Sequence, residues 1–405
     1  AVGLDGGDGA LAPVRTGRRI GALALGIALV VPLVLPSLDG GILGPSGTGV
    51  GSGTGGGGTI SAVNPLVSLQ NSLNQPEDRE VLTYRTNAPD TSGMYLRIVS
   101  LDEFDGTTWR PSVRSITDVP SRLPAPRGLA ADVRRTEVTT RISAADWYAQ
   151  DWLPMPYPAT RVAIGGHWRF EHIGRTLVGD HGQTTRGQTY TVKSLQVRPT
   201  PEQLADAPPP PADIVRDFTK VPGSLPAVVA STARKVTAGA VNDYERAVKL
   251  QDYFAVSGGF TYNTQVKAGS GVDAIARFLK QKEGFCVHFA FSMAAMARTL
   301  GIPARVAVGF TPGSPTADGA MSVGLRDAHA WPELYFEGVG WTRFEPTPTR
   351  GSVPEYTQDD PSTGSSSAPA APTESASDLP TAAAPSASAN CPAAERRMGD
   401  CGGTA

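Results

Sequence analysis

Hydrophobic and polar positions divide the chain into segments of different periodicity. Between residues 77 and 198, short runs rich in β-branched and aromatic residues alternate with turn residues, as at 80–86 and 189–197. This pattern predicts an antiparallel β-rich domain, sandwich-like or barrel-like. After the proline-rich stretch 199–211, apolar residues recur at helical spacing. The segment 199–255 is therefore predicted to be a helical lead-in.

The segment 256–349 contains helical patterns first and strand patterns later. A short helix is expected at 273–279, and a long apolar run from Cys286 to Gly301 predicts a second helix. The strand 304–310 and a hairpin between His329 and Glu345 follow. This order predicts an α+β unit in which a helix bearing Cys286 packs on an antiparallel sheet.

The first 76 residues predict a membrane anchor and a tether. Residues 20–38 form an apolar run of about 19 residues without a charge, close to the ~20 that cross a bilayer. The segment 1–19 has three arginines near this run, and is therefore expected to be cytoplasmic. We predict a transmembrane helix, a Gly-rich tether at 39–76 and an extracytoplasmic main chain. The alternative, a secretory signal peptide, also places the main domains outside the cytoplasm.

Composition narrows the class of protein. The net charge of -2 over 405 residues gives no argument for nucleic acid as a partner. Three cysteines without a C-x-x-C pair argue against a disulfide-built fold and a zinc ribbon. The Ala/Pro/Ser/Thr-rich tail 350–405 is expected to be disordered. Its Cys391 and Cys401 could pair with each other, stay unpaired or form a bridge to something beyond the end of this fragment. If they pair with each other, Cys286 has no obvious partner.

The order of Cys286, His329 and Glu345 is that of a nucleophile, its base and the acid that orients the base. A helix start presents unpaired N–H groups and a positive dipole end, which favour a thiolate. The imidazole would hold the thiolate and protonate the leaving group. The N–H of Cys286 would help to hold the oxyanion. Such a site needs no metal and no cofactor. The opposite interpretation is that Cys286 is a small buried hydrophobe.

The orienting acid remains open between Glu345 and Asp327. A hairpin that pairs residues 336 and 341 puts Glu345 opposite Pro332, ~10 Å along the strand from His329. A bulge, a twist or a register error must close that gap. Asp327, two residues from His329, is the alternative.

The other candidates have structural explanations. His288 points about 200° round the helix from Cys286 and is expected to be structural or to line the rim. Tyr262 and Trp331 are candidates for lining the cleft, although core or hairpin packing is the simpler explanation. Surface positions are expected for the remaining histidines, His167, His172 and His181.

Four sequence blocks resemble the transglutaminase-like core. They are Gly284-Phe285-Cys286, Gly301-Ile302-Pro303-Ala304-Arg305, Asp327-Ala328-His329-Ala330-Trp331-Pro332-Glu333-Leu334-Tyr335 and Gly340-Trp341-Thr342-Arg343-Phe344-Glu345-Pro346-Thr347. The wider layout resembles bacterial membrane-anchored transglutaminase-like proteins. Full-length relatives have further membrane helices, so we take this chain to be a fragment or a processed form.

The resemblance implies a papain-like transglutaminase core at 256–349 and a thioester mechanism. It assigns the nucleophile to Cys286, the base to His329 and the third position to Glu345, where the family usually has Asp. The implied activity is acyl transfer on Gln or peptide carbonyls, by transamidation, deamidation or proteolysis. Its substrates would be proteins, peptides or cell-wall peptide. The alternative is a non-catalytic cell-envelope module that uses the same fold to bind.

Overall fold

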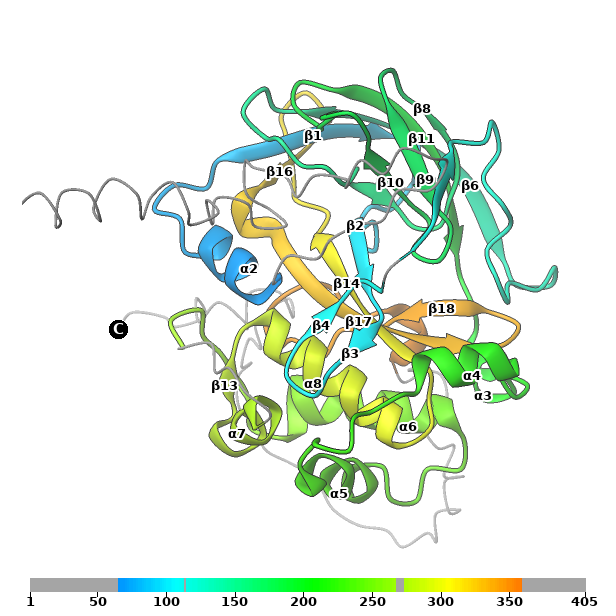
Figure 1. Ribbon diagram of the computed structural model, residues 1–405, viewed down its shortest axis with the longest axis vertical. Coiled ribbons are helices and arrows are strands. Elements are labelled where there is room, and N and C mark those ends of the chain that lie inside the picture. The colour runs from blue at the N-terminus through cyan, green and yellow to red at the C-terminus, as the bar shows by residue number, and fades with distance from the viewer. Residues whose placement is uncertain (1–64, 113, 267–272, 359–405) are drawn as a thin grey trace, which may run out of the picture. The chain divides into compact units, whose positions relative to one another are not determined.

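The computed structural model describes residues 65–112, 114–266 and 273–358, and two antiparallel sheets dominate them (Figure 1). In this part of the chain, the larger sheet has six strands, in the order β15 (Ser314–Pro315), β16 (Met321–Gly324), β1 (Glu80–Thr86), β6 (Arg135–Ala144), β11 (Thr189–Val197) and β8 (Ala159–Ala163). The other has five, in the order β18 (Gly340–Arg343), β17 (Ala328–Phe336), β14 (Ala304–Phe310), β2 (Leu96–Leu101) and β7 (Met155–Pro156).

Smaller elements complete the described part. A three-stranded sheet has the strand order β10 (Thr176–Gly179), β9 (Trp168–Glu171) and β5 (Ile116–Asp118). Two further sheets have two strands each: β3 (Glu103–Phe104) pairs with β4 (Trp109–Arg110), and β12 (Thr261–Tyr262) pairs with β13 (Glu283–Gly284). The helices are α2 (Pro65–Leu73), α3 (Pro201–Ala205), α4 (Ala212–Phe218), α5 (Ala227–Val236), α6 (Asp243–Asp252), which continues as a π-helix to Ser257, α7 (Ala274–Gln281) and α8 (Cys286–Thr299).

The described residues contain no helix that is long and apolar enough to span a membrane. The predicted span 20–38 lies outside these residues. So do most of the tether and nearly all of the tail, with Cys391 and Cys401.

Both large sheets take strands from both halves of the chain. Strands β2 and β7, from the predicted β-rich segment, complete the sheet that carries β14 and β17. Conversely, β16 pairs with β1 in the larger sheet. Between β14 and β16, the two-residue strand β15 is too short to show a periodic pattern in the sequence. The β-rich part and the core therefore form one continuous structure.

Helix α8 lies between the five-stranded sheet and helices α5, α6 and α7 (Figure 1). Buried positions extend from Cys286 to Arg298 on all sides, so the helix is apolar all round rather than amphipathic. It ends in a Schellman motif, in which Ile302 N–H donates to Ala297 C=O at 3.0 Å and Gly301 adopts φ +82°. A glycine is required there because other residues rarely adopt positive φ.

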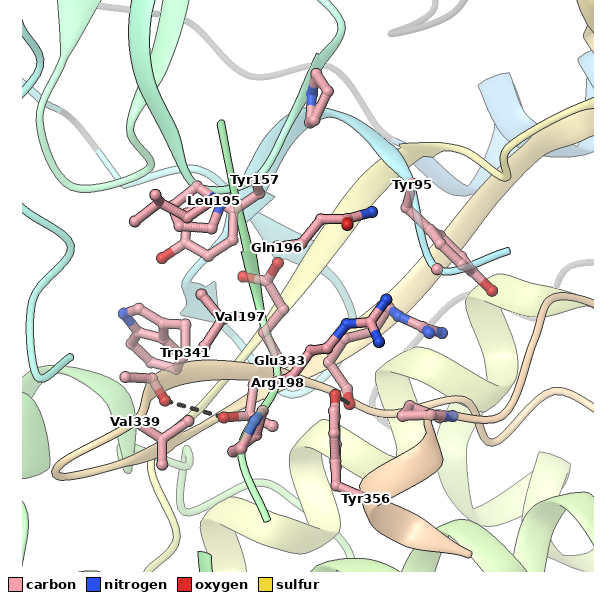
Figure 2. Close-up of a pocket in the computed structure, with 18 of the residues that line it drawn as sticks. Tyr95, Tyr157, Leu195, Gln196, Val197, Arg198, Glu333, Val339, Trp341 and Tyr356 are labelled. Carbon is pink, nitrogen blue, oxygen red and sulfur yellow. Dashed lines mark hydrogen bonds between the residues drawn. The ribbon is translucent and has the colours of Figure 1, made fainter. Parts of the chain in front are cut away.

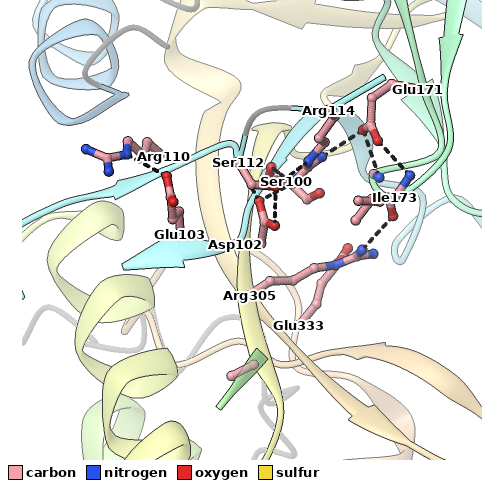
Figure 3. A network of polar contacts seen from close by, with 12 residues as sticks. Ser100, Asp102, Glu103, Arg110, Ser112, Arg114, Glu171, Ile173, Arg305 and Glu333 are labelled. Atoms are coloured by element: carbon pink, nitrogen blue, oxygen red, sulfur yellow. Dashed lines mark hydrogen bonds and ion pairs between the residues drawn. The ribbon is translucent and has the colours of Figure 1, made fainter. Parts of the chain in front are cut away.

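Buried ion pairs join the strands next to the helix (Figure 3). Arg305 Nε lies 2.7 Å from Glu333 Oε2, and the two residues are cross-strand partners on β14 and β17. Arg97 on β2 donates to the same carboxylate at 3.0 Å. All three side chains are at most 4% exposed. Because each charge is desolvated, the loss of one partner leaves an uncompensated buried charge.

Candidate active site

Cys286 is the first residue of α8, and its side chain is fully buried. The preceding residue, Phe285, has an extended backbone (φ -119°, ψ 177°), and strand β13 just before it pairs in parallel with β12. The chain therefore changes from strand to helix at the thiol. This turn leaves the first N–H groups of α8 without partners inside the helix, as a thiolate or an oxyanion site requires.

His329 on β17 contacts Glu345, which follows β18. The His329 Nε2 atom lies 3.1 and 3.0 Å from the two carboxylate oxygens, and both side chains are at most 1% exposed. Burial would lower the pKa of His329, but the charge of Glu345 and the neighbouring Cys286 outweigh it and raise this pKa from 6.5 to about 9. Burial would likewise raise the pKa of Glu345, but the charge of His329 holds it below its usual value. The pair is therefore ionic at neutral pH.

The other ring nitrogen of His329 faces a different environment. Nδ1 has no hydrogen-bond partner of regular geometry among the described residues, although Cys286 is close enough to influence the charge of the ring. Cys286 therefore lies beside the imidazole and helps to raise the pKa of His329.

The hairpin register explains how Glu345 reaches His329. Phe336 pairs with Gly340, not with Trp341, so the expected register was wrong by one residue. Continued along the strand, the observed register puts residue 345 opposite Trp331. Trp331 lies on the same face as His329 because strand side chains alternate with a period of two. A slip of one residue would have placed the carboxylate on the opposite face.

Asp327 is held away from the imidazole. One of its oxygens accepts a hydrogen bond from Gly324 N at 2.8 Å, and the other accepts one from the Thr311 hydroxyl at 3.2 Å. Burial raises the pKa of Asp327. Its hydrogen bonds stabilise the turn before β17, so the geometry favours Glu345 over Asp327 as the partner of His329.

Glu345 also has partners that the sequence motifs do not indicate. Tyr95 donates its hydroxyl to Glu345 Oε2 at 2.8 Å, and Thr347 N donates to Oε1 at 3.3 Å. The buried Gln251 on α6 accepts the Glu345 N–H at 2.9 Å. Sequence reasoning missed Tyr95 and Gln251, because neither lies in a recognisable block.

Tyr262 lies near the thiol. Its partner in the β12–β13 pair is Gly284, two residues before Cys286. The Tyr262 hydroxyl is buried and has no hydrogen-bond partner among the described residues. Burial and then the charge of Cys286 raise its pKa. Tyr262 therefore lies close to the thiol, and its place at the cleft stays a prediction.

His288 and Trp331 have packing partners. His288 Nδ1 accepts the Phe285 N–H at 3.3 Å, its ring stacks on Phe278, and burial lowers its pKa to about 4. These contacts favour a structural role for His288 over a place at the rim. Trp331 stacks near His329 at 6.2 Å between ring centroids and meets Tyr95 edge-on at 4.9 Å. The remaining histidines, His167, His172 and His181, are exposed.

A cavity of about 230 Å³ adjoins this arrangement (Figure 2). Tyr95 and Trp331 belong to its lining, and so do residues from the end of β11 and from the β17–β18 hairpin: Leu195, Gln196, Val197, Arg198, Glu333, Val339 and Trp341. Two aromatic residues that contact the His329–Glu345 pair thus also line a space bordered by the β-rich part.

A thiol at the start of a helix, beside a histidine that contacts a carboxylate, can act as a nucleophile. Residues 230–346 match the transglutaminase-like superfamily, and residues 3–201 match the TgpA N-terminal domain. The chain therefore carries a transglutaminase-like core preceded by a TgpA N-terminal domain. The predicted α+β fold with antiparallel sheets and this core is confirmed.

Three relatives are similar to parts of the chain. The uncharacterized protein YebA of Bacillus subtilis is 32% identical over 151 residues, which cover 35% of this chain and 20% of that protein. The protein-glutamine gamma-glutamyltransferase of Pseudomonas aeruginosa is 39% identical over 90 residues, 22% of this chain and 13% of that protein. The matches thus span at most a fifth of the length of these two proteins. The crystal structure of the periplasmic domain of TgpA from Pseudomonas aeruginosa has a TM-score of 0.55 at 20% identity, covering 73% of this chain and 94% of that one.

Proposed function

We propose that this protein is an extracytoplasmic cysteine enzyme that transfers acyl groups from glutamine carboxamides or peptide carbonyls through a thioester on Cys286. The buried ion pair between His329 and Glu345 carries the proposal, because it keeps an imidazolium next to Cys286 at neutral pH. The similarity to a protein named protein-glutamine gamma-glutamyltransferase supports glutamine as the acyl donor.

The chemistry follows from the roles of the three side chains. The Cys286 thiolate attacks the carboxamide carbon, and the N–H groups at the start of α8 stabilise the oxyanion. His329 gives its proton to the departing ammonia or amine, which leaves a thioester. An amine or a water molecule then attacks the thioester, His329 takes its proton, and the thiolate is released. An amine produces a cross-link, whereas water produces deamidation or hydrolysis.

The location and the substrates are part of the same proposal. The solved relative is described as a periplasmic domain, and the apolar run 20–38 would anchor the chain with its main domains outside. Substrates there would be proteins, peptides or cell-wall peptide.

Alkylation of Cys286 tests the proposal. Because the thiol is buried, the small reagent iodoacetamide is used at pH 7, and the modified cysteine is located by peptide mass spectrometry. We expect His329→Ala to slow alkylation of Cys286 on the order of 100-fold. Ser292→Ala, a change of a buried residue further along the same helix, should leave the rate unchanged. Equal rates in His329→Ala and the wild type would contradict an activated thiol.

Transfer activity is measured with a fluorescent primary amine and casein. Cys286→Ala should abolish incorporation of the amine and release of ammonia, whereas Ser292→Ala should retain both. The alternative is a binding module without catalysis, which the long tail and the Glu in place of the usual Asp at position 345 would favour. Glu345 nevertheless contacts His329, which weakens the second of these two arguments. Persistent incorporation by Cys286→Ala would refute the thioester mechanism.

A further inference from the structure

Tyr95 comes from the N-terminal part of the chain but contacts the candidate active site. It directly precedes β2, inside the segment that matches the TgpA N-terminal domain. Its hydroxyl lies 2.8 Å from Glu345 Oε2, across 250 positions of sequence. Gly309 on β14 allows β2 to lie close to that strand, since a Cβ at that position would collide with the carbonyl oxygen of Leu96, the residue after Tyr95.

The direction of the hydrogen bond is determined by a second one. The N–H of Ser352 donates to the Tyr95 oxygen at 2.9 Å. A hydroxyl has a single proton, and since the backbone N–H can only donate, this proton is free to point at Glu345. Glu345 therefore acts as an acceptor, which favours its ionised form.

The Tyr95 ring is held from several sides. The guanidinium carbon of Arg343 lies 4.1 Å from its ring centroid, and Trp331 contacts it edge-on at 4.9 Å. The side chain is 5% exposed. A buried aromatic ring with these neighbours has little freedom to move its hydroxyl away from the carboxylate.

We propose that Tyr95 is a positioning residue that fixes the carboxylate of Glu345 against His329, so that the TgpA N-terminal domain completes the active site of the core. This inference rests on the proposed function. A glutamate has one more rotatable bond than the aspartate usual at this position, and so needs a further contact to hold one orientation. Tyr95 supplies that contact on Oε2, while Thr347 N holds Oε1.

The test compares Tyr95→Phe with Tyr190→Phe. Tyr190 is also buried and donates its hydroxyl to the Pro154 carbonyl at 2.7 Å, but it lies on β11, outside the contacts of Glu345. The rate of Cys286 alkylation by iodoacetamide is measured from pH 5 to 10. We expect Tyr95→Phe to shift the rate profile upward by about one pH unit, so the rate at neutral pH falls on the order of 10-fold. The plateau at high pH should not change, because access to the thiol is unaltered.

A second variant covers the case in which Tyr95→Phe does not fold. Gly351→Ala places a Cβ against both the Tyr95 hydroxyl and Glu345 Oε2, and should shift the profile in the same direction. In a Glu345→Gln background, Tyr95→Phe should have no further effect, since Tyr95 acts through Glu345. If wild-type alkylation is fast at neutral pH and Tyr95→Phe matches Tyr190→Phe, the positioning role is refuted while the proposed function stands. Slow wild-type alkylation at neutral pH would instead refute the proposed function.

Discussion

Replacing Glu345 by Gln removes one charge beside His329 and keeps the size of the side chain. In the folded protein His329 has a pKa of about 9, against an ordinary value of 6.5. A group whose pKa is raised by folding stabilises the folded state fully at pH values below its pKa in the unfolded chain. This contribution disappears as the pH rises through the pKa of the group in the folded protein. The window for His329 is therefore between pH 6.5 and about 9.

The magnitude follows from the same two values. The difference between 6.5 and about 9 corresponds to about 3 kcal/mol in the free energy of unfolding. In Glu345→Gln, burial of His329 is no longer opposed by a carboxylate, so its pKa falls and the contribution is lost. We expect the variant to be less stable than the wild type by about 3 kcal/mol at pH 6, and by less than about 1 kcal/mol at pH 9.5.

Urea unfolding at constant ionic strength, followed by tryptophan fluorescence at pH 6, 7.5 and 9.5, measures this difference. Asp327→Asn is the matched control, because it also converts a carboxylate to an amide. Burial raises the pKa of Asp327 from 3.8. The difference in the free energy of unfolding between Asp327→Asn and the wild type should therefore vary with pH in the acid range and stay constant between pH 6.5 and 9.5. If Glu345→Gln lowers the free energy of unfolding by the same amount at pH 6 and at pH 9.5, the ion pair between His329 and Glu345 is refuted.

Two further changes test the framework of the site. Glu333→Gln leaves Arg97 and Arg305 without their shared carboxylate, and should lower the free energy of unfolding in urea by about 3–5 kcal/mol. The control Glu103→Gln, in an exposed ion pair, should lower it by less than about 1 kcal/mol. Equal losses of stability in the two variants would contradict the role of burial. Gly301→Ala imposes a side chain at φ +82° and should lower the free energy of unfolding by about 1–3 kcal/mol. The alkylation rate of Cys286 at neutral pH should not change. An unchanged midpoint of urea unfolding would contradict the requirement for a glycine after α8.

Local patterns were sufficient for many elements of the fold. The strands 80–86, 189–197 and 304–310 have the bounds expected from their β-branched and apolar residues. The helix from Cys286 was expected to stop at Gly301, and it ends at Thr299 with Gly301 in the motif that terminates it. These features depend on neighbours within a few positions, so the sequence displays them directly.

The contacts of Glu345 were less accessible from the sequence. The order of Cys286, His329 and Glu345 suggested their roles, but the expected hairpin register put the carboxylate on the wrong face. The turn 337–340 could close in more than one way, and its glycines do not select one register by pattern alone. Only the paired strands show that Phe336 meets Gly340.

By itself, the sequence determined the element types, the resemblance to the transglutaminase-like core and the placement of Cys286 at a helix start, because periodicity, capping and motif spacing are local properties. The tertiary structure decided that β2 enters the sheet of the core, that Arg97 and Arg305 share Glu333, and that Tyr95 holds the carboxylate facing His329. These contacts join residues far apart in the chain, up to 250 positions in the case of Tyr95 and Glu345. Their partners are selected by packing and by the need to satisfy buried charges, which only the folded chain brings together.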